Sequence, residues 1–243
     1  MAVAVPLSFF PVAVHRPPFA RPHCMKSPRV PIALEGYPFI LFAGFATLVF
    51  ALLERAELAL PCLLVTAFVT WFFRDPDRVG PDRADAFVSP ADGKVIIAEE
   101  VDDPRFVHGR ARKISIFMNV FDVHVNRLPY RGRVEQILLR PGKFYAADSE
   151  RGALQNEHCA MTVLAENNLR YGVVQMAGLI ARRIVCWAEK GDDLATGQRY
   201  GLIRFGSRVD LYLPMQLELR VAKGDRVRAG ETVIASLAGT DFT

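Results

Sequence analysis

Two uncharged runs near the start of the chain constrain its fold more than any other feature. The first covers residues 36–53 (GYPFILFAGFATLVFALL) and the second covers residues 58–73 (LALPCLLVTAFVTWFF). A helix needs about 20 apolar residues to cross a bilayer, with a range of about 17–25, so the first run just qualifies and the second falls slightly short. Only residues 54–57 separate the runs. We therefore predict an apolar, membrane-associated helical hairpin over residues 35–74.

The flanks of this hairpin indicate its orientation. Trp71, Phe72 and Phe73 stand next to Arg74 and resemble an interfacial anchor of aromatic and basic residues. Basic residues precede the first helix and follow the second, whereas the turn carries two acids and one arginine. The positive-inside rule then places both ends in the cytoplasm, so we expect the cytoplasmic face of the cell membrane. A hairpin buried in a soluble core and a hairpin lying in the membrane interface are the alternatives.

Residues 1–34 precede the hairpin and are rich in Pro, Ala and Val, with basic residues and no acid. The apolar residues at the start lack a basic segment before them and are interrupted by Pro6 and Pro11. This argues against a cleaved signal peptide. We expect a disordered basic leader, with Met25 as a second candidate start.

The composition narrows the class of partner. A net charge of +4 suits a protein that lies against anionic lipid or handles a phosphate-bearing ligand. No run of Lys and Arg is interleaved with aromatic residues, so we expect no nucleic-acid partner. The four cysteines are scattered singly with no C-x-x-C pair, which predicts neither a metal site nor a disulfide framework.

From residue 75 onward the chain changes to short runs of strand length separated by turn residues. Polar and apolar residues alternate clearly at residues 208–214 and 217–221. The spacing predicts a mainly β (α+β) soluble domain over residues 75–243, a β-sandwich or barrel. Residues 221–237 have the turns of barrel-sandwich modules that carry biotin or lipoyl groups, without the carrier lysine. One short helix is predicted at residues 178–187 (GLIARRIVCW).

The pair Gly206-Ser207 is the first candidate for chemistry. Gly206 lets another group approach its carbonyl closely, and Ser207 places a hydroxyl one residue downstream. A serine in this position can attack the peptide bond before it and cut the chain. Taken alone, such a pair is more often an ordinary turn or bulge.

A serine nucleophile needs a base, because a free hydroxyl is barely ionised at neutral pH. Of the five histidines, two lie in the leader and one in a polar turn, which leaves His124 and His158. On a strand, Asp122, His124 and Asn126 project from one face, which either faces solvent or lines a pocket. Asp92 precedes Gly93 in an Asp-Gly turn, a common pair that often has no function.

The pair Arg182-Arg183 stands in an otherwise apolar run. Burying two guanidinium groups is costly unless an anion meets them, and a phosphate is the natural candidate. The alternative is a pair of surface arginines whose stems cover apolar side chains.

Seven motifs in one order give the chain a family resemblance. They are FRDPDR (73–78), SPADG (89–93), FMNVFDVHVNRLP (117–129), PGKF (141–144), NE (156–157), QMAGLIARR (175–183) and GS (206–207). Together they resemble the short form of the phosphatidylserine decarboxylase family, whose members are self-processing pyruvoyl enzymes. The resemblance covers residues 73–237 and includes the hairpin before them.

The resemblance implies that Ser207 attacks the carbonyl of Gly206 and forms an ester. Elimination to dehydroalanine and hydrolysis would leave a pyruvoyl group at the start of a small chain, residues 207–243. This chain would stay with the large chain, residues 1–206, as a heterodimer. The covalent pyruvoyl group derived from Ser207 is then the cofactor, with no metal. The zymogen would become a lyase that forms a Schiff base with phosphatidylserine and releases phosphatidylethanolamine in phospholipid biosynthesis, with a phospholipid substrate and the membrane as partners.

The resemblance also assigns roles. The family is described as using an Asp-His-Ser arrangement for self-cleavage, and Asp92, His124 and Ser207 match it. Longer members carry a second histidine where this chain has Arg127, which leaves open whether His124 acts in self-cleavage, in proton transfer during decarboxylation, or in both. Arg182 and Arg183 are candidates for the lipid phosphate. His158 stands where the family has an arginine.

Two other classes of function fit part of the sequence. One is a membrane-anchored adaptor with a lipoyl-like β-module and no catalysis. The other is a membrane serine hydrolase that uses Ser207 with His124 or Lys143. Both would keep the chain intact, so the mass of the purified protein separates them from a self-cleaving decarboxylase.

Overall fold

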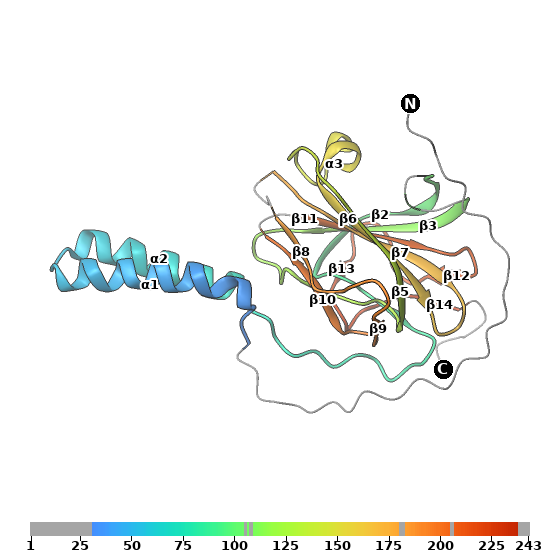
Figure 1. The fold of residues 1–243 in the computed structure, drawn as a ribbon, viewed down its shortest axis with the longest axis horizontal. Helices are drawn as coiled ribbons and strands as arrows, with labels where there is room; N and C mark the ends of the chain where they lie inside the picture. The colour runs from blue at the N-terminus through green and yellow to red at the C-terminus, as the bar shows by residue number, and fades with distance from the viewer. Residues whose placement is uncertain (1–30, 105, 107–108, 180–182, 205–206, 238–243) are drawn as a thin grey trace. The chain divides into compact units, whose positions relative to one another are not determined.

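The helical hairpin forms as predicted. The computed structural model describes residues 31–104, 106, 109–179, 183–204 and 207–237, so the leader residues 1–30 lie outside the described part. After the short 3-10 helix η1 (Leu34–Gly36), α1 (Tyr37–Leu52) and α2 (Ala56–Phe72) lie side by side (Figure 1). A hydrogen bond of 3.2 Å between the hydroxyls of Thr47 and Thr66 joins the two helices.

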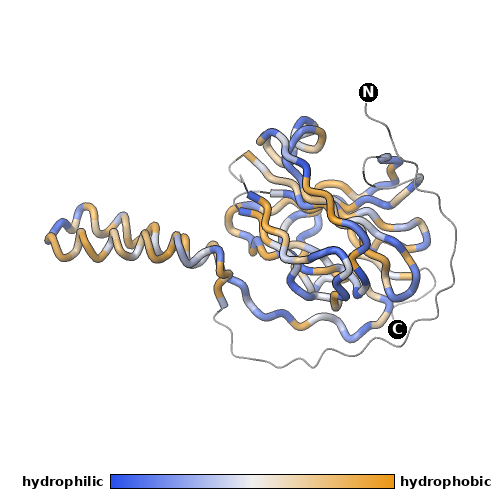
Figure 2. The backbone as a smooth tube through the Cα atoms, in the orientation of Figure 1, coloured by the Kyte–Doolittle hydropathy of each residue, from blue (hydrophilic) through white to orange (hydrophobic). Residues whose placement is uncertain are grey.

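The outside of the hairpin is apolar. Figure 2 shows hydrophobic residues along both helices, and their side chains are uncovered: Phe42 is 77% exposed and Leu64 is 71% exposed. Residues Leu34–Leu52 form a helical stretch long and apolar enough to cross a membrane, whereas Ala56–Phe72 is shorter. So much bare apolar surface does not fit the alternative of a hairpin buried in a soluble core.

The rest of the described chain is mainly β, which confirms the predicted fold class. Its elements are β1 (Phe87–Val88), β2 (Gly93–Asp102), β3 (Arg110–Met118), β4 (Val125–Arg127), β5 (Gly132–Arg140), α3 (Glu150–Gln155), β6 (His158–Ala165), β7 (Arg170–Met176), β8 (Ile184–Cys186), β9 (Asp193–Leu194), β10 (Arg199–Ile203), β11 (Ser207–Leu213), β12 (Leu217–Leu219), β13 (Arg226–Val227) and β14 (Val233–Leu237).

The strands form three antiparallel sheets within the described residues. The largest has the order β13-β2-β3-β11-β7-β6-β5-β9, and the two small sheets have the orders β1-β14-β12 and β4-β10-β8. β11 is central in the large sheet, because it pairs with β3 on one side and β7 on the other. All seven of its residues are buried. The strand that begins at Ser207 is therefore held between two neighbours.

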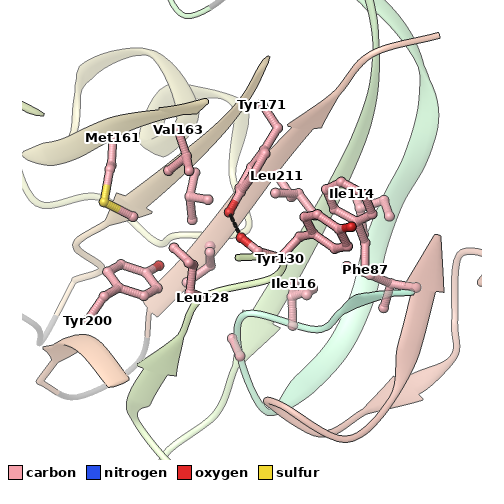
Figure 3. Close-up of a cluster of buried hydrophobic side chains, with 14 of the residues drawn as sticks. Phe87, Ile114, Ile116, Leu128, Tyr130, Met161, Val163, Tyr171, Tyr200 and Leu211 are labelled. Atoms are coloured by element: carbon pink, nitrogen blue, oxygen red, sulfur yellow. Dashed lines mark hydrogen bonds between the residues drawn. The ribbon is translucent and has the colours of Figure 1, made fainter. Parts of the chain in front are cut away.

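The core packs between the large sheet and the small sheets. Phe87 stacks on Tyr130 with ring centroids 4.5 Å apart and meets Tyr171 edge-on at 5.5 Å. The Tyr171 hydroxyl donates a hydrogen bond to the carbonyl oxygen of Tyr130 (Figure 3). Leu211 of β11 lies in the same cluster. Aromatic and branched side chains from all parts of the domain thus fix the position of β11.

The predicted helix at residues 178–187 is wrong. Ile184–Cys186 forms β8, which pairs antiparallel with β10 through Gly201↔Cys186 and Ile203↔Ile184. A short apolar run does not distinguish a helix from a strand by its pattern, and here β-branched residues and the free edge of β10 favour the strand.

The end of the hairpin packs directly on the β domain. Phe72 and Phe73 belong to one buried cluster with Val123, Val125 and Leu202. The two ends of the hairpin are also joined to each other, because the N–H of Ala33, just before η1, donates to the carbonyl of Phe73 at 2.8 Å. The apolar helices are therefore joined to the segment that carries His124.

Candidate active site

Ser207 is the first residue of β11 and is completely buried. Its backbone pairs with Met118, the last residue of β3. The Ser207 Oγ has no hydrogen-bond partner among the described residues, which is unusual for a buried hydroxyl. Gly206 lies outside the described residues. A buried serine with an unused hydroxyl fits a group that is consumed in a reaction better than a structural serine.

Arg208 points away from this site. Alternation along β11 puts Ser207 on the face of Val209 and Leu211, and puts Arg208 on the opposite face with Asp210. There the guanidinium is bonded to the carboxylate of Asp210 at 2.5 and 2.9 Å and to the Ser115 hydroxyl at 3.0 Å. The arginine of Gly-Ser-Arg is thus neutralised on the far side of the strand.

His124 lies just before β4 and is also completely buried. Its Nδ1 is 2.9 Å from the carbonyl oxygen of Asp122, and its Nε2 has no partner among the described residues. Burial lowers the pKa of His124 to about 4, so the ring is neutral at pH 7. A carbonyl only accepts, so Nδ1 carries the proton and Nε2 keeps a free lone pair. His124 therefore has the form of a base.

The backbone brings His124 and Ser207 into the same region. The N–H of Ile203 donates to the His124 carbonyl at 3.3 Å, and Ile203 lies four residues before Ser207. On the other side, Met118 pairs with Ser207 and lies six residues before His124. Two buried, unpaired polar atoms, one hydroxyl and one basic nitrogen, thus belong to neighbouring segments.

The predicted polar face of one strand is only partly correct. β4 begins at Val125, and the Asp122 carboxylate instead caps a turn by accepting from the N–H of Asn119 at 2.9 Å. His124 and Asn126 are buried, which excludes the solvent-facing alternative for these two residues. Asp122 therefore contacts His124 through its backbone carbonyl, whereas its carboxylate caps the turn.

Asp92 is held in a tight turn beside β4. Its Oδ2 accepts from Arg78 at 2.8 Å and its Oδ1 accepts from the N–H of Ala229 at 2.7 Å. Burial raises the pKa of Asp92, and these two donors oppose the rise. Gly93 is required here, because a Cβ at its φ of 152° would lie 2.2 Å from the carbonyl oxygen of Phe117.

Asp92 and His124 are connected only indirectly within the described residues. The N–H of Arg127 in β4 donates at 2.9 Å to the carbonyl of Pro90, in the same turn as Asp92. No hydrogen bond or ion pair between the two side chains is present in the described part of the chain. A backbone hydrogen bond therefore links the turn that holds Asp92 to β4, the strand that follows His124.

Arg127, the position at which the family resemblance predicts a second histidine in longer members, belongs to a buried ionic clamp. Its guanidinium donates to Asp75 at 3.3 Å, to the Pro76 carbonyl at 2.8 Å and to the Gly197 carbonyl at 3.1 Å. Arg199 bonds the same Asp75 at 2.6 Å. The FRDPDR motif thus ties the segment after α2 to β4 and β10.

Gln175 has no predicted role of its own, but it lies on β7 opposite Val209, two residues from Ser207 on β11. Its Nε2 donates to Asn126 Oδ1 at 2.8 Å, and its Oε1 is buried without a partner in the described chain. Asn126 in turn contacts the sulfur of Met118 at 3.7 Å. The only sequence signal for Gln175 was its place in the QMAGLIARR motif.

The NE motif has a structural function. The Asn156 amide accepts from the N–H of Tyr145 and donates to the carbonyls of Tyr145 and Ala177, each at 2.8 Å. It fastens the PGKF loop to the end of β7. His158 lies beyond it, with its ring edge-on to Phe106 at 5.3 Å.

The predicted phosphate pair is only partly described. Arg182 lies outside the described residues, and Arg183 is exposed immediately before β8. The Arg183 carbonyl accepts from the N–H of Arg204 at 3.3 Å. A metal cluster of three or more His, Cys, Asp or Glu is not found in the described part of the chain.

The fold and the site define a mainly β protein with an apolar helical hairpin. It has a buried serine whose hydroxyl has no partner among the described residues, on a segment that neighbours the one with a neutral, buried histidine. Comparison with known proteins gives the family. The model of the phosphatidylserine decarboxylase family matches residues 65–235. The chain belongs to this family and is a decarboxylase.

Relatives match over almost their whole length. The chain is 55% identical over 213 residues to the phosphatidylserine decarboxylase proenzyme of Desulfotalea psychrophila, which covers 88% of this chain and 100% of that protein. It is 50% identical over 213 residues to the proenzyme of the same name from Geotalea uraniireducens, with the same shares covered. The family resemblance predicted from the seven motifs is confirmed.

Proposed function

We propose that this decarboxylase acts on phosphatidylserine through a pyruvoyl group that it makes from its own Ser207. The observation that carries the proposal is the buried Ser207 Oγ, which has no partner among the described residues and stands where the Gly-Ser pair predicts a cut. The site fits such a group, because an uncharged serine at the start of a central strand can be converted without leaving a buried charge.

In the proposed self-cleavage, Ser207 Oγ attacks the carbonyl carbon of Gly206. His124 Nε2 accepts the hydroxyl proton, because it is the nitrogen with a free lone pair. The peptide C–N bond breaks, and an ester links Gly206 to the Ser207 oxygen. Loss of the Gly206 carboxylate by elimination and then hydrolysis with release of ammonia leave the pyruvoyl group on residue 207.

The pyruvoyl group supplies an acceptor for the electron pair that remains when carbon dioxide leaves the substrate. The residues around it would hold the substrate and exclude water. His124 is the proposed proton carrier near the reacting carbon, and Gln175 Oε1 is the proposed acceptor for the substrate amine, because neither His124 Nε2 nor Gln175 Oε1 has a partner among the described residues. We propose Asp92 as a positioning residue, since both its oxygens are already bonded.

The paired strands support a stable heterodimer after the cut. β11 pairs with β3 through residues 207–213 and with β7 through residues 208–212. β13 pairs with β2, and β14 pairs with β1. The chain from residue 207 onward would therefore remain part of the sheets.

A membrane location at the cytoplasmic face completes the proposal. Supporting it are the exposed apolar side chains of α1 and α2 and the Arg74 guanidinium, which lies 3.7 Å from the centre of the Trp71 ring. Phe121 is 63% exposed and lies beside Trp71, so the site segment also presents an apolar side chain near this anchor. The purified protein should float with liposomes, and Leu41→Lys together with Leu64→Lys should weaken that flotation.

The activity is tested by decarboxylation of phosphatidylserine in detergent micelles. Wild-type protein should release carbon dioxide, and borohydride in the presence of substrate should abolish the activity by reducing the carbonyl adduct. An intact, inactive chain that a fluorophosphonate labels at Ser207 would favour a serine hydrolase instead.

A further inference from the structure

Arg204 stands between the site and the hairpin. It follows β10 directly and lies three residues before Ser207. Its neighbour Ile203 donates its N–H to the carbonyl of His124, so the backbone at Arg204 adjoins the histidine segment. Its guanidinium carbon lies 5.4 Å from the centre of the Phe39 ring in α1. The Arg204 side chain thus extends from the His124 segment toward the first turn of α1.

The guanidinium of Arg204 is poorly neutralised. Its Nε is buried without a hydrogen-bond partner among the described residues, and no carboxylate lies within ion-pair distance of it in the described chain. Burial and the neighbouring Arg183 lower the pKa of Arg204, and Glu35 opposes them. The Oε1 of Glu35 accepts from the Trp187 indole at 2.8 Å and its Oε2 is buried without a hydrogen-bond partner, and among the described residues Glu35 forms no ion pair with Arg204.

Other covered arginines of this domain differ in this respect. Arg78 bonds Asp92 at 2.8 Å, and Arg208 bonds Asp210 at 2.5 Å. Partly burying a cation that has no carboxylate partner costs free energy unless an anion from outside the chain pairs with it. Arg204 therefore has the character of a binding residue whose partner is not among the described residues of the chain.

We propose that Arg204 binds the phosphodiester of the phospholipid substrate, an inference that rests on the proposed function. The planar guanidinium matches the two free oxygens of a phosphodiester. Its place against Phe39 suits a headgroup whose acyl chains continue along exposed apolar side chains of α1 such as Phe42 and Phe45.

The substrate carboxylate is the less suitable partner. It must lose its charge as carbon dioxide, so a cation bound to it would stabilise the ground state more than the transition state and slow the reaction. The phosphodiester keeps its charge throughout. A cation bound there holds the lipid without opposing the chemistry.

The first test measures binding without catalysis. Dihexanoyl phosphatidylcholine carries the phosphodiester, but its quaternary amine cannot react with a carbonyl. Calorimetry should show that Arg204→Gln binds this lipid about tenfold or more weakly than wild type, whereas Arg204→Lys loses less. Arg140→Gln, a change at an exposed arginine of β5, is the control and should bind as wild type does. Equal binding by Arg204→Gln and wild type would overturn the proposal.

The second test uses the reaction. Self-cleavage, measured by mass, should be intact in Arg204→Gln, which also shows that the variant folds. Its kcat/KM for phosphatidylserine should fall by about tenfold to a hundredfold, mainly through KM. For an O-alkyl serine ether that lacks the phosphate, wild type and Arg204→Gln should agree within about twofold, because the partner of Arg204 is missing. An equal loss on both substrates would contradict phosphate binding.

The two tests separate this inference from the function on which it rests. If wild-type protein binds the choline lipid through Arg204 but does not decarboxylate phosphatidylserine, the proposed function is contradicted and the Arg204 proposal is not. If wild-type protein is active and Arg204→Gln has the same lipid affinity and the same kcat/KM, the Arg204 proposal is contradicted and the proposed function is not.

Discussion

The imidazole ring of His124 packs on the phenyl ring of Phe72, with the ring centroids 4.4 Å apart. Phe72 is the last residue of α2, and only 1% of it is exposed. The apolar hairpin therefore forms one wall around the proposed base. Because burial is the main cause of the low pKa of His124, the hairpin helps to keep this histidine neutral.

Phe72→Ala should raise the pKa of His124 from about 4 toward its ordinary value of 6.5, because water enters the space left by the ring. It should also destabilise the protein by about 3–5 kcal/mol. The pH dependence of self-cleavage in freshly translated protein measures the first effect, and thermal melting measures the second. Leu64→Ala, at an exposed position of α2, is the matched control. A pH profile that Phe72→Ala leaves unchanged would show that the contact does not set the pKa.

Self-cleavage should be independent of pH between about 6 and 8 and should fall to half near pH 4, where His124 takes up a proton. The same titration affects stability. The folded pKa lies below the unfolded value, so the stability is complete above pH 6.5 and is lost as the pH falls through 4.

The loss should be roughly 3 kcal/mol across this pH range. Melting temperatures of uncleaved Ser207→Ala protein at several pH values measure it, and the double variant with His124→Gln should lack this part of the pH dependence. If both proteins respond equally to acid, His124 is not a buried neutral group.

Asp92→Asn should slow self-cleavage by at least about tenfold, because it weakens the bonds that fix the turn beside β4. Arg78→Gln removes the partner of Asp92 and should slow cleavage similarly. If Asp92 acts by position, the double variant should be little slower than either single variant. Normal cleavage in Arg78→Gln combined with inactive Asp92→Asn would mean that the carboxylate takes part directly.

The cleaved chains should stay together without denaturant, because β11 lies between β3 and β7. Gel filtration in mild detergent should give one peak that contains both, and urea should separate them. Early loss of the fragment that begins at residue 207 would contradict the heterodimer.

Local patterns were enough to predict the hairpin, the β class and the alternating residues 208–214, most of which lie in β11. The helix at residues 178–187 failed because its apolar run carries no period, and its pairing partner, β10, lies further along the chain. A strand partner of this kind has to be found in three dimensions.

The site was harder to predict because its contacts join distant parts of the chain. Arg127 meets Asp75 across 52 positions, and Gln175 meets Asn126 across 49. The sequence marked Arg127 as a departure from longer relatives, but only the fold shows that it belongs to a clamp. In the same way, the lack of a hydrogen-bond partner for the Arg204 Nε among the described residues is visible only after its neighbours are known.

The central claim is that the chain cuts itself before Ser207, and the mass of the purified protein tests it most directly. The wild type should give a chain ending at Gly206 and a fragment of residues 207–243 that is lighter than the plain peptide by one ammonia. Ser207→Ala should give a single intact chain. An intact wild-type chain, or two fragments from Ser207→Ala, would contradict the account.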